Sequence, residues 1–146
     1  GLPHRLEYIA GNNGVAWYND SKSTTAESID CAVRAFPAGV HLIAGGKDKG
    51  CDFSVVNEAV SCFVKSIALI GEAAGRMTRE WDGLAPIIRA ETLEEAVAAA
   101  AAKAIPGETV VFSPGCSSFD MFRNYEDRGD RFRETVLRQI GVDNHE

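Results

Sequence analysis

Apolar runs of strand length alternate with helical segments along most of this chain, and this alternation limits the folds open to it. The apolar runs lie at residues 40–44, 65–70, 86–90 and 109–113. Runs that are nearly continuously apolar are typical of strands buried on both faces of a sheet. Short links between each strand and the next helix favour right-handed crossovers and parallel strands. The sequence therefore predicts a three-layer α/β fold with a mostly parallel sheet.

Helices are expected between these runs, and a β-hairpin before them. Apolar residues at helical spacing predict helices at 24–36, 54–63, 72–80, 92–104 and 130–140. Residues 6–10 and 15–19 are rich in strand-forming side chains and flank the turn sequence GNNG, which tolerates positive φ. We therefore expect the hairpin at the N-terminal edge of the sheet.

Length and composition favour one globular domain over residues 1–146. Hydrophobic residues make up 45% of the chain and charged residues 25%, which is typical of a globular protein with a real core. The net charge of −6 argues against a nucleic-acid surface. No apolar run approaches the roughly 20 residues that span a bilayer. The polar start, GLPHRLE, carries no signal peptide and begins as if mid-chain, so we expect a domain excised from a larger protein.

The four cysteines predict reduced thiols in a cytoplasmic protein. Cys31, Cys51, Cys62 and Cys116 form no C-x-x-C pair, and their spacing matches neither a zinc site nor a secreted disulfide scaffold. Cys31 and Cys62 fall on helical patterns and are expected in the core as small hydrophobic residues. No H-E-x-x-H or EF-hand pattern is present, so no metal site is expected.

Ligands of open α/β sheets bind beyond the carboxyl ends of the strands. That rule selects four segments of this chain: residues 19–25, 45–52, 71–72 and 113–120. The second, GGKDKGCD, combines two glycines with Lys47 and Lys49, so its backbone can turn tightly beside cationic donors. It lacks the G-x-x-x-x-G-K-[ST] spacing of a P-loop, and a solvated loop with surface lysines is the alternative.

The other two polar segments favour an anion site as well. Residues 19–28, NDSKSTTAES, lead from a strand into a helix whose free N–H groups would attract an anion, although a plain helix cap at Thr24 or Thr25 explains them equally well. Residues 113–120, SPGCSSFD, lack the spacing of a nucleophile elbow, and no histidine is placed to activate Cys116. This loop is therefore interpreted as a carboxylate-binding loop, with the charged segment 126–133 fixing it.

Four segments in this order carry a family resemblance: GLPHRLE, NDSKSTTAES, LIAGGKDKGCDF and FSPGCSSFDMFRNYEDRGDRF. Together they resemble the C-terminal domain of Mur ligases, in particular the branch that adds D-glutamate. The resemblance runs from residue 1 to about residue 140. It implies a Rossmann-like domain that follows two others, a UDP-substrate domain and a central ATPase domain that carries the P-loop and holds most of the Mg²⁺.

The resemblance also implies a reaction. In this family ATP activates the carboxylate of UDP-N-acetylmuramoyl-L-alanine, and the amine of D-glutamate attacks it to give an amide, ADP and phosphate. The product is a peptidoglycan precursor, so the implied role extends to cell wall biogenesis, cell shape and cell division. The C-terminal domain brings D-glutamate and closes over ATP, and alone it is expected to be inactive and to bind its ligands weakly.

Site residues follow from the matching motif positions. Arg5 and Asp20 match residues that contact the ATP phosphate and ribose, and no catalytic residue is expected in this domain. The positions that match the D-glutamate pocket are Thr24, Lys49 and Ser118 for its carboxylates, Phe119 and Tyr125 for its walls, and Lys22 beside it. The sequence departs from the family at Thr25, where Asn is frequent, and at Tyr125, where Phe is common.

A second hypothesis needs no parent enzyme. The same loops could form a stand-alone, non-catalytic α/β module that binds a nucleotide or an acidic metabolite. A P-loop segment upstream of residue 1 in the reading frame would favour the ligase, and a start codon directly before it would favour the module.

Overall fold

The computed structural model describes residues 2–141, so the domain expected over 1–146 is described without its first residue and its last five. Six strands form one sheet in the order β1-β2-β6-β3-β4-β5. The strands are β1 (Glu7–Asn12), β2 (Val15–Asn19), β3 (Val40–Gly45), β4 (Val64–Ile70), β5 (Ile87–Arg89) and β6 (Thr109–Phe112). The helices are α1 (Ala26–Arg34), the 3-10 turn η1 (Phe53–Val56), α2 (Asn57–Phe63), α3 (Ala74–Glu80), α4 (Leu93–Lys103) and α5 (Tyr125–Gln139).

The predicted edge hairpin is confirmed. Strands β1 and β2 pair antiparallel, with Asn12 opposite Val15. Asn13 and Gly14 form the turn with φ of 54° and 78°, the conformation that the GNNG sequence favours. Every other pairing in the sheet, β2–β6, β6–β3, β3–β4 and β4–β5, is parallel.

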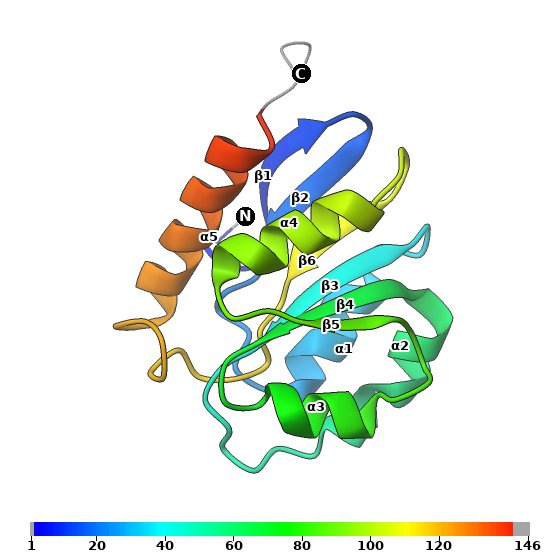
Figure 1. The fold of residues 1–146 in the computed structure, drawn as a ribbon, viewed down its shortest axis with the longest axis vertical. Helices are drawn as coiled ribbons and strands as arrows, with labels where there is room; N and C mark the ends of the chain where they lie inside the picture. Colours follow the sequence, from blue (N-terminus) through cyan, green and yellow to red (C-terminus); the bar gives the residue numbers. More distant parts are fainter. Residues whose placement is uncertain (1, 142–146) are drawn as a thin grey trace.

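The three-layer architecture is confirmed as well. Strand β3, at the centre of the sheet, is buried along all six of its residues. Helices α1, α2 and α3 with η1 cover one face through a core that includes Ile29, Phe53 and Trp81. Helices α4 and α5 cover the other face through a core that includes Trp17, Phe112 and Phe132. In Figure 1 these two groups of helices lie on opposite sides of the sheet.

Side-chain caps set where three of the helices begin. Thr25 Oγ1 accepts from the Ser28 N–H at 3.2 Å at the start of α1. Thr92 Oγ1 accepts from the Glu95 N–H at 3.1 Å at the start of α4. Asn124 Oδ1 accepts from the Asp127 N–H at 2.7 Å at the start of α5. Such caps satisfy N–H groups that have no partner within the helix.

Three predicted helices agree with the structure to within two residues at each end, and the other two differ more. The helix expected at 54–63 is divided into the 3-10 turn η1 and α2, and Asp52 caps the turn. The last helix begins at Tyr125 and not at residue 130, because the Asn124 cap starts it five residues earlier. The charged segment 126–133 therefore belongs to α5 itself.

The prediction that Cys31 and Cys62 lie in the core is wrong. Both thiols are exposed, on α1 and α2 respectively, because the core faces of these helices are filled by Ile29 and Val33 and by Ala59 and Val60. Cys116 is buried, as expected of a packing residue.

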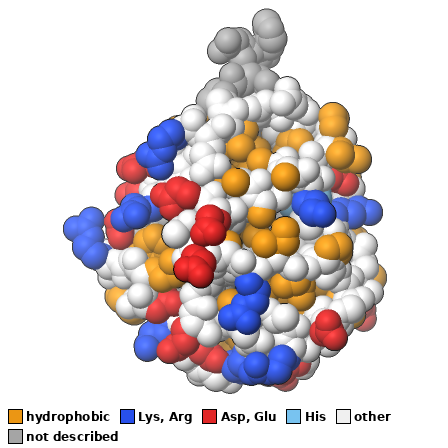
Figure 2. Space-filling model, viewed as in Figure 1, with side chains coloured by type: hydrophobic (Ala, Val, Ile, Leu, Met, Phe, Trp, Pro, Cys, Tyr) orange, Lys and Arg blue, Asp and Glu red, His pale blue; other side chains and the backbone are white. Residues whose placement is uncertain are grey.

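The surface carries charge of both signs. On the face shown in Figure 2, acidic and basic side chains lie next to one another, and no single sign covers it. None of the helices within residues 2–141 is long and apolar enough to cross a membrane.

Candidate functional site

The four strand-end segments meet at the carboxyl edge of the sheet, as the strand order requires. Asp20 connects two of them, since its N–H donates to Phe112 O at 2.8 Å and its Oδ2 accepts from Ser113 Oγ at 2.9 Å. Its Oδ1 accepts from the Leu6 N–H at 3.1 Å. Asp20 thereby fixes the start of the chain, the β2–α1 loop and the end of β6 in one arrangement.

The glycine loop after β3 packs directly on the loop after β6. The Gly45 N–H donates to Pro114 O and the Lys47 N–H to Ser117 O, both at 3.0 Å. Gly46 has φ of +145°, and a Cβ there would lie 2.7 Å from Ser117 O. Only glycine permits both this conformation and this approach. The predicted tight turn of residues 45–46 is confirmed, and it positions the Lys47–Lys49 segment beside Ser117 and Ser118.

Glu72 and Asp120 join the remaining segment to the same edge. The Glu72 N–H donates to Asp120 Oδ2 at 3.1 Å, and Glu72 Oε1 accepts from the Asp48 N–H at 2.8 Å. Arg76 then binds Asp48 Oδ1 at 2.6 Å. The backbone of the lysine loop is therefore fixed from the side of α3 as well as from β6.

A buried arginine ties the β2–α1 loop to the β6–α5 loop. Arg128 of α5 is 1% exposed. Its guanidinium donates to Ser21 O at 2.6 Å, to Ser21 Oγ at 2.9 Å and to Cys116 O at 2.9 Å. Burial lowers the pKa of Arg128 to about 10, so the side chain stays charged at neutral pH. Arg128 thus fixes the loop from within the charged segment, and Asp127 adds a bond to it by accepting from the Arg123 N–H at 3.1 Å.

No carboxylate of the described residues forms an ion pair with Arg128; all its bonds go to carbonyl and hydroxyl oxygens. The charge of Arg128 is therefore not cancelled by a direct ion pair, although the Asp120 carboxylate nearby interacts with it electrostatically. The sequence analysis did not select Arg128, because nothing in its spacing distinguishes it from the exposed charges around it.

The nucleotide residues expected from the motif lie close together. Arg5 and Asp20 line one cavity of about 180 Å³ beside α1, and so does Lys22, which is expected beside the D-glutamate pocket. Burial raises the pKa of the Asp20 carboxyl above its ordinary 3.8, and the bonds from Ser113 and Leu6 and the charge of Arg5 offset that effect only in part. Asp20 is mostly buried, whereas Arg5 and Lys22 are exposed.

The residues expected to hold D-glutamate lie on loops of the same edge. Ser118 is 3% exposed, Thr24 and Tyr125 are half-buried, and Lys49 is exposed. Lys22 Nζ lies 5.9 Å from the centre of the Tyr125 ring, and Ser21 Oγ donates to Tyr125 O at 2.7 Å. Phe119, expected as a pocket wall, has 68% of its surface exposed. It therefore lies at the surface of this domain and not within a closed pocket.

Two hydroxyls that the sequence analysis did not select are buried without partners. Ser23 Oγ and Ser117 Oγ form no hydrogen bond with any part of the chain that the structure describes. Leaving a buried hydroxyl without a partner costs about 1–3 kcal/mol. Ser117 follows Cys116 in the β6–α5 loop and Ser23 precedes Thr24, so both lie beside residues expected to bind a ligand.

Cys116 is unsuited to nucleophilic chemistry. Burial, with a smaller contribution from Cys51, raises the pKa of its thiol to about 12. A thiol of this pKa is almost fully protonated at neutral pH, and the thiolate is the nucleophile. This agrees with the expectation that Cys116 is a packing residue.

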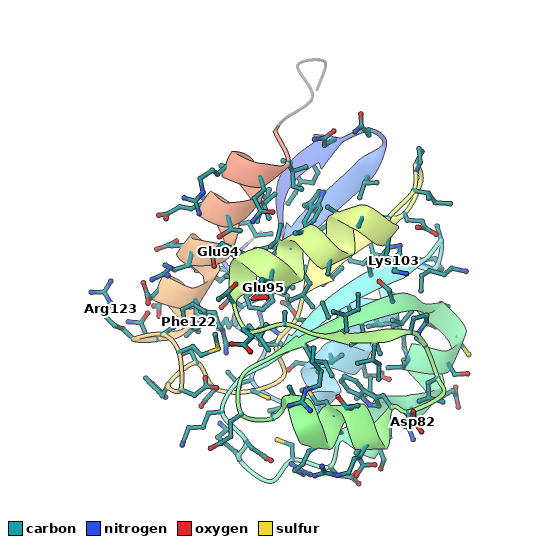
Figure 3. All side chains as sticks on the ribbon, in the orientation of Figure 1. Asp82, Glu94, Glu95, Lys103, Phe122 and Arg123 are labelled. Carbon is teal, nitrogen blue, oxygen red and sulfur yellow. The ribbon has the colours of Figure 1, made fainter. Side chains whose placement is uncertain are left out.

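The β6–α5 loop is exposed at Phe119 and Arg123, whereas Phe122 packs partly against the core beneath α4 and α5. Figure 3 shows Arg123 extending away from the body of the domain, near Phe122. The Arg123 side chain is 86% exposed and its nearest carboxylate oxygen, of Asp127, is 3.5 Å away.

Glu94 and Glu95 lie on the first turn of α4, and Glu95 is exposed, as is typical of a solvated helix face.

Magnesium has no evident ligand set among these residues. Within residues 2–141 no group of three or more His, Cys, Asp or Glu side chains is arranged to hold a metal ion.

The fold and this edge define a class: an α/β domain in which glycine turns, lysines, hydroxyls and a buried arginine surround the carboxyl ends of parallel strands. The family described as "Mur ligase, glutamate ligase domain" matches residues 4–116. The chain belongs to that family.

Curated relatives agree with the match. The chain is 46% identical to the UDP-N-acetylmuramoylalanine--D-glutamate ligase of Acidobacterium capsulatum over 97% of its own length and 31% of the relative's. It is 52% identical to the ligase of that name from Pelobacter propionicus, over 92% of its own length and 30% of the relative's. It is 49% identical to the Aquifex aeolicus ligase of that name, over 93% of its own length and 33% of the relative's. The chain thus spans about a third of these relatives and aligns with their C-terminal part.

Solved structures show the same fold at low identity. The MurF ligase from Thermotoga maritima in complex with ADP has a TM-score of 0.63 at 15% identity, over 96% of this chain and 32% of that one. E. coli FolC in complex with DHPP and ADP has a TM-score of 0.63 at 16% identity, over 94% and 32%. These matches confirm the three-layer, mostly parallel architecture.

Proposed function

We propose that this chain is the C-terminal domain of an ATP-dependent ligase that joins D-glutamate to UDP-N-acetylmuramoyl-L-alanine. The observation that carries the proposal is the identity of 46–52% with D-glutamate ligases over more than nine-tenths of the chain. The domain's task is to hold D-glutamate and to cover the nucleotide at the carboxyl edge of the sheet. The full protein would act in the cytoplasm, in peptidoglycan precursor synthesis.

The D-glutamate site is proposed at the loops that Arg128 joins. D-Glutamate has two carboxylates and one reactive amine, so a productive site must bind the carboxylates and leave the amine free. Lys49 supplies a charge for one carboxylate, and Thr24 and Ser118 supply hydroxyl donors. The orphan hydroxyl of Ser117 adds a donor that the protein itself does not use. Phe119 and Tyr125 would border the site, and Lys22 would lie beside it.

Orientation is the contribution that this domain can make to the rate. None of the loop residues needs to exchange a proton with the substrate. A site that fixes both carboxylates holds the amine in one direction, which converts an encounter into a positioned attack. The backbone bonds of Asp20, Gly45 and Lys47 keep the loops rigid enough for this task.

The nucleotide site is proposed at the cavity lined by Arg5 and Asp20. Arg5 is exposed and can reach a phosphate, and the remaining lone pairs of the Asp20 carboxylate can accept from ribose hydroxyls. The missing N-terminal and central domains would supply the P-loop, most of the contacts to Mg²⁺ and the UDP-sugar site. Alone, this domain should therefore be inactive and bind ATP and D-glutamate weakly.

The proposal is tested in the parent enzyme by steady-state kinetics. Lys49→Ala and Ser118→Ala should each raise the KM for D-glutamate or lower turnover about tenfold or more, because each removes a charge-assisted bond. Asp20→Ala should act chiefly on ATP. Lys103→Ala, an exposed lysine in the last turn of α4, is the matched control and should change neither constant. Unchanged D-glutamate kinetics in both pocket variants would refute the site.

A further inference from the structure

The cavity beside α1 contains a thiol that the proposed function does not use. Cys31 lines it together with Arg5, Asp20, Lys22, Ser23 and Ser28, in a volume of about 180 Å³. Of the four cysteines, Cys31 and Cys62 are exposed, Cys51 is half-buried and Cys116 is buried. Cys31 is thus the exposed thiol that opens into a cavity with charged walls.

The charged residues that line this cavity favour a negatively charged ligand. Arg5 and Lys22 contribute two cations and Asp20 one carboxylate, which leaves one net positive charge. Both Asp20 oxygens already accept hydrogen bonds from Leu6 and Ser113. Arg5 forms no ion pair with any carboxylate in residues 2–141, and Lys22 has only the distant Tyr125 ring. Neither cation is held in a direct ion pair, so both can contact a ligand, although Arg5 also attracts the Asp20 carboxylate.

A second observation points to a ligand at the same place. Ser23 lines the cavity and is 3% exposed, and its Oγ has no hydrogen-bond partner among the described residues. A polar group so deeply buried is normally paired. Because the Oγ atom is itself covered, the Ser23 side chain would have to rotate for a molecule in this cavity to bond with it.

We propose that Cys31 is a site of reversible thiolation by small anionic disulfides, and that the attached group fills this cavity. The thiolate sulfur of Cys31 attacks one sulfur of the disulfide, a new S–S bond forms, the old one breaks, and the second half leaves as a thiol after taking up a proton. The disulfide is the oxidant, so no other reagent is needed. Excess free thiol reverses the step.

A regulatory consequence follows, and it rests on the proposed function. If the nucleotide ribose and phosphates occupy the cavity of Arg5 and Asp20, a group on Cys31 competes with them. Thiolation would then stop the parent enzyme under oxidising conditions, and bound nucleotide would protect the thiol.

Cys62 provides an internal control for the test. It is also exposed and also on a helix, but α2 contributes no residue to this cavity, and Glu58 lies one turn before it. The chain is treated with oxidised glutathione, which is anionic, or with bis(2-hydroxyethyl) disulfide, which is neutral. Labelling of each cysteine is followed by mass spectrometry of peptides. We expect the Cys31-to-Cys62 rate ratio to be about fivefold higher with the anionic reagent.

Charge variants show whether the cations are the cause. Arg5→Gln with Lys22→Gln should remove the preference, as should 1 M salt, whereas Lys65→Gln on β4 should leave it unchanged. A ratio that is the same for the two reagents, or that survives in the double variant, would overturn the proposal.

An ADP arm separates this proposal from the proposed function. ADP at millimolar concentration should slow labelling of Cys31 and not of Cys62. If the anionic preference is present but ADP gives no protection, the thiolation site stands and the nucleotide assignment of Arg5 and Asp20 is wrong. If ADP protects but the preference is absent, the nucleotide assignment stands and the thiolation site is wrong.

Discussion

The two ends of the parallel sheet differ in how completely their buried polar groups are paired. At the amino end, His41 of β3 is 3% exposed, and both its ring nitrogens are paired: Nδ1 with Ser66 Oγ at 2.7 Å and Nε2 with Glu108 Oε1 at 2.6 Å. The Ile105 N–H also donates to Glu108 Oε1 at 3.1 Å. At the carboxyl end, Arg128 is buried without a carboxylate, and Ser23 Oγ and Ser117 Oγ have no partner in residues 2–141.

The difference separates a structural network from a ligand edge. Polar groups that are hydrogen-bonded to one another stabilise the fold and leave no free donor or acceptor for a ligand. Groups that are buried and unsatisfied cost stability, and such costs concentrate at functional sites. The amino end therefore serves the fold, and the carboxyl end is where we propose that ligands bind. Four substitutions test this comparison, in order of falling effect on stability.

The largest effect is expected at Arg128. Arg128→Met leaves the oxygens of Ser21 and Cys116 buried without their donor, and should lower the free energy of unfolding by about 3–5 kcal/mol in urea titrations. Arg123→Met removes the same charge from an exposed side chain in the preceding loop and should change it by about 0.5 kcal/mol or less. Similar losses in the two variants would contradict the role given to Arg128.

A smaller loss is expected at Gly129, next to it in α5. Gly129→Ala would place a Cβ on the ring of His4, which is held at φ of +63° and lies 3.0 Å from Asn19 Nδ2. We expect a loss of about 1–3 kcal/mol in thermal or urea unfolding. Gly75→Ala in α3 is the control, since its nearest atoms lie 3.7 Å away on flexible arginine side chains. That variant should be neutral or stabilising, by up to about 1 kcal/mol.

Glu108, at the amino end of the sheet, should make the free energy of unfolding depend on pH. Burial by itself would raise the pKa of Glu108, but hydrogen bonds from His41 and the Ile105 N–H, with Lys65 nearby, lower it below the ordinary 4.5. A lowered carboxyl pKa contributes stability above that ordinary value, and the contribution is lost as pH falls through the folded pKa. Glu108→Gln should reduce this acid sensitivity and cost on the order of 1 kcal/mol at pH 7. Glu91→Gln is the control: Glu91 is exposed, so this variant should change neither the acid sensitivity nor the stability at pH 7.

The smallest effect on stability is expected at the proposed ligand contacts. Lys49→Ala should change the free energy of unfolding by less than about 0.5 kcal/mol, because the side chain is exposed and forms no ion pair in the described chain. The same substitution should impair D-glutamate use by the parent enzyme. A stability loss comparable to that of Gly129→Ala would place Lys49 among structural residues.

Much of this fold could be predicted from periodicity, because its strands are buried on both faces and its links are short. The hairpin was marked by GNNG, and the carboxyl-edge rule named the four loops that do meet. The start of α5 was placed five residues late, since the alternating charges after Asn124 resemble a loop until the cap is recognised. The sequence does not predict the exposure of Cys31 and Cys62, because a small residue on a helix fits either the core or the surface.

The residues of the candidate site could be predicted from the sequence less completely than the fold. Arg128 stands among Glu126, Asp127 and Arg131, and only the structure shows that its side chain alone enters the protein. The orphan hydroxyls of Ser23 and Ser117 could not be told from their neighbours Thr24 and Ser118, because hydrogen-bond satisfaction depends on long-range contacts. The roles of Thr24, Lys49, Ser118, Phe119 and Tyr125 remain predictions.

The most direct test of the ligand edge is a titration of this chain with D-glutamate, followed by backbone amide NMR. Weak binding is expected, so the ligand is raised to tens of millimolar, with L-glutamate as the matched control. The account predicts shifts of the Thr24, Lys49 and Ser118 amides with D-glutamate that exceed those with L-glutamate, while His41 and Glu108 stay unchanged. Shifts at the amino end, equal responses to the two enantiomers, or no response at the carboxyl edge would contradict it.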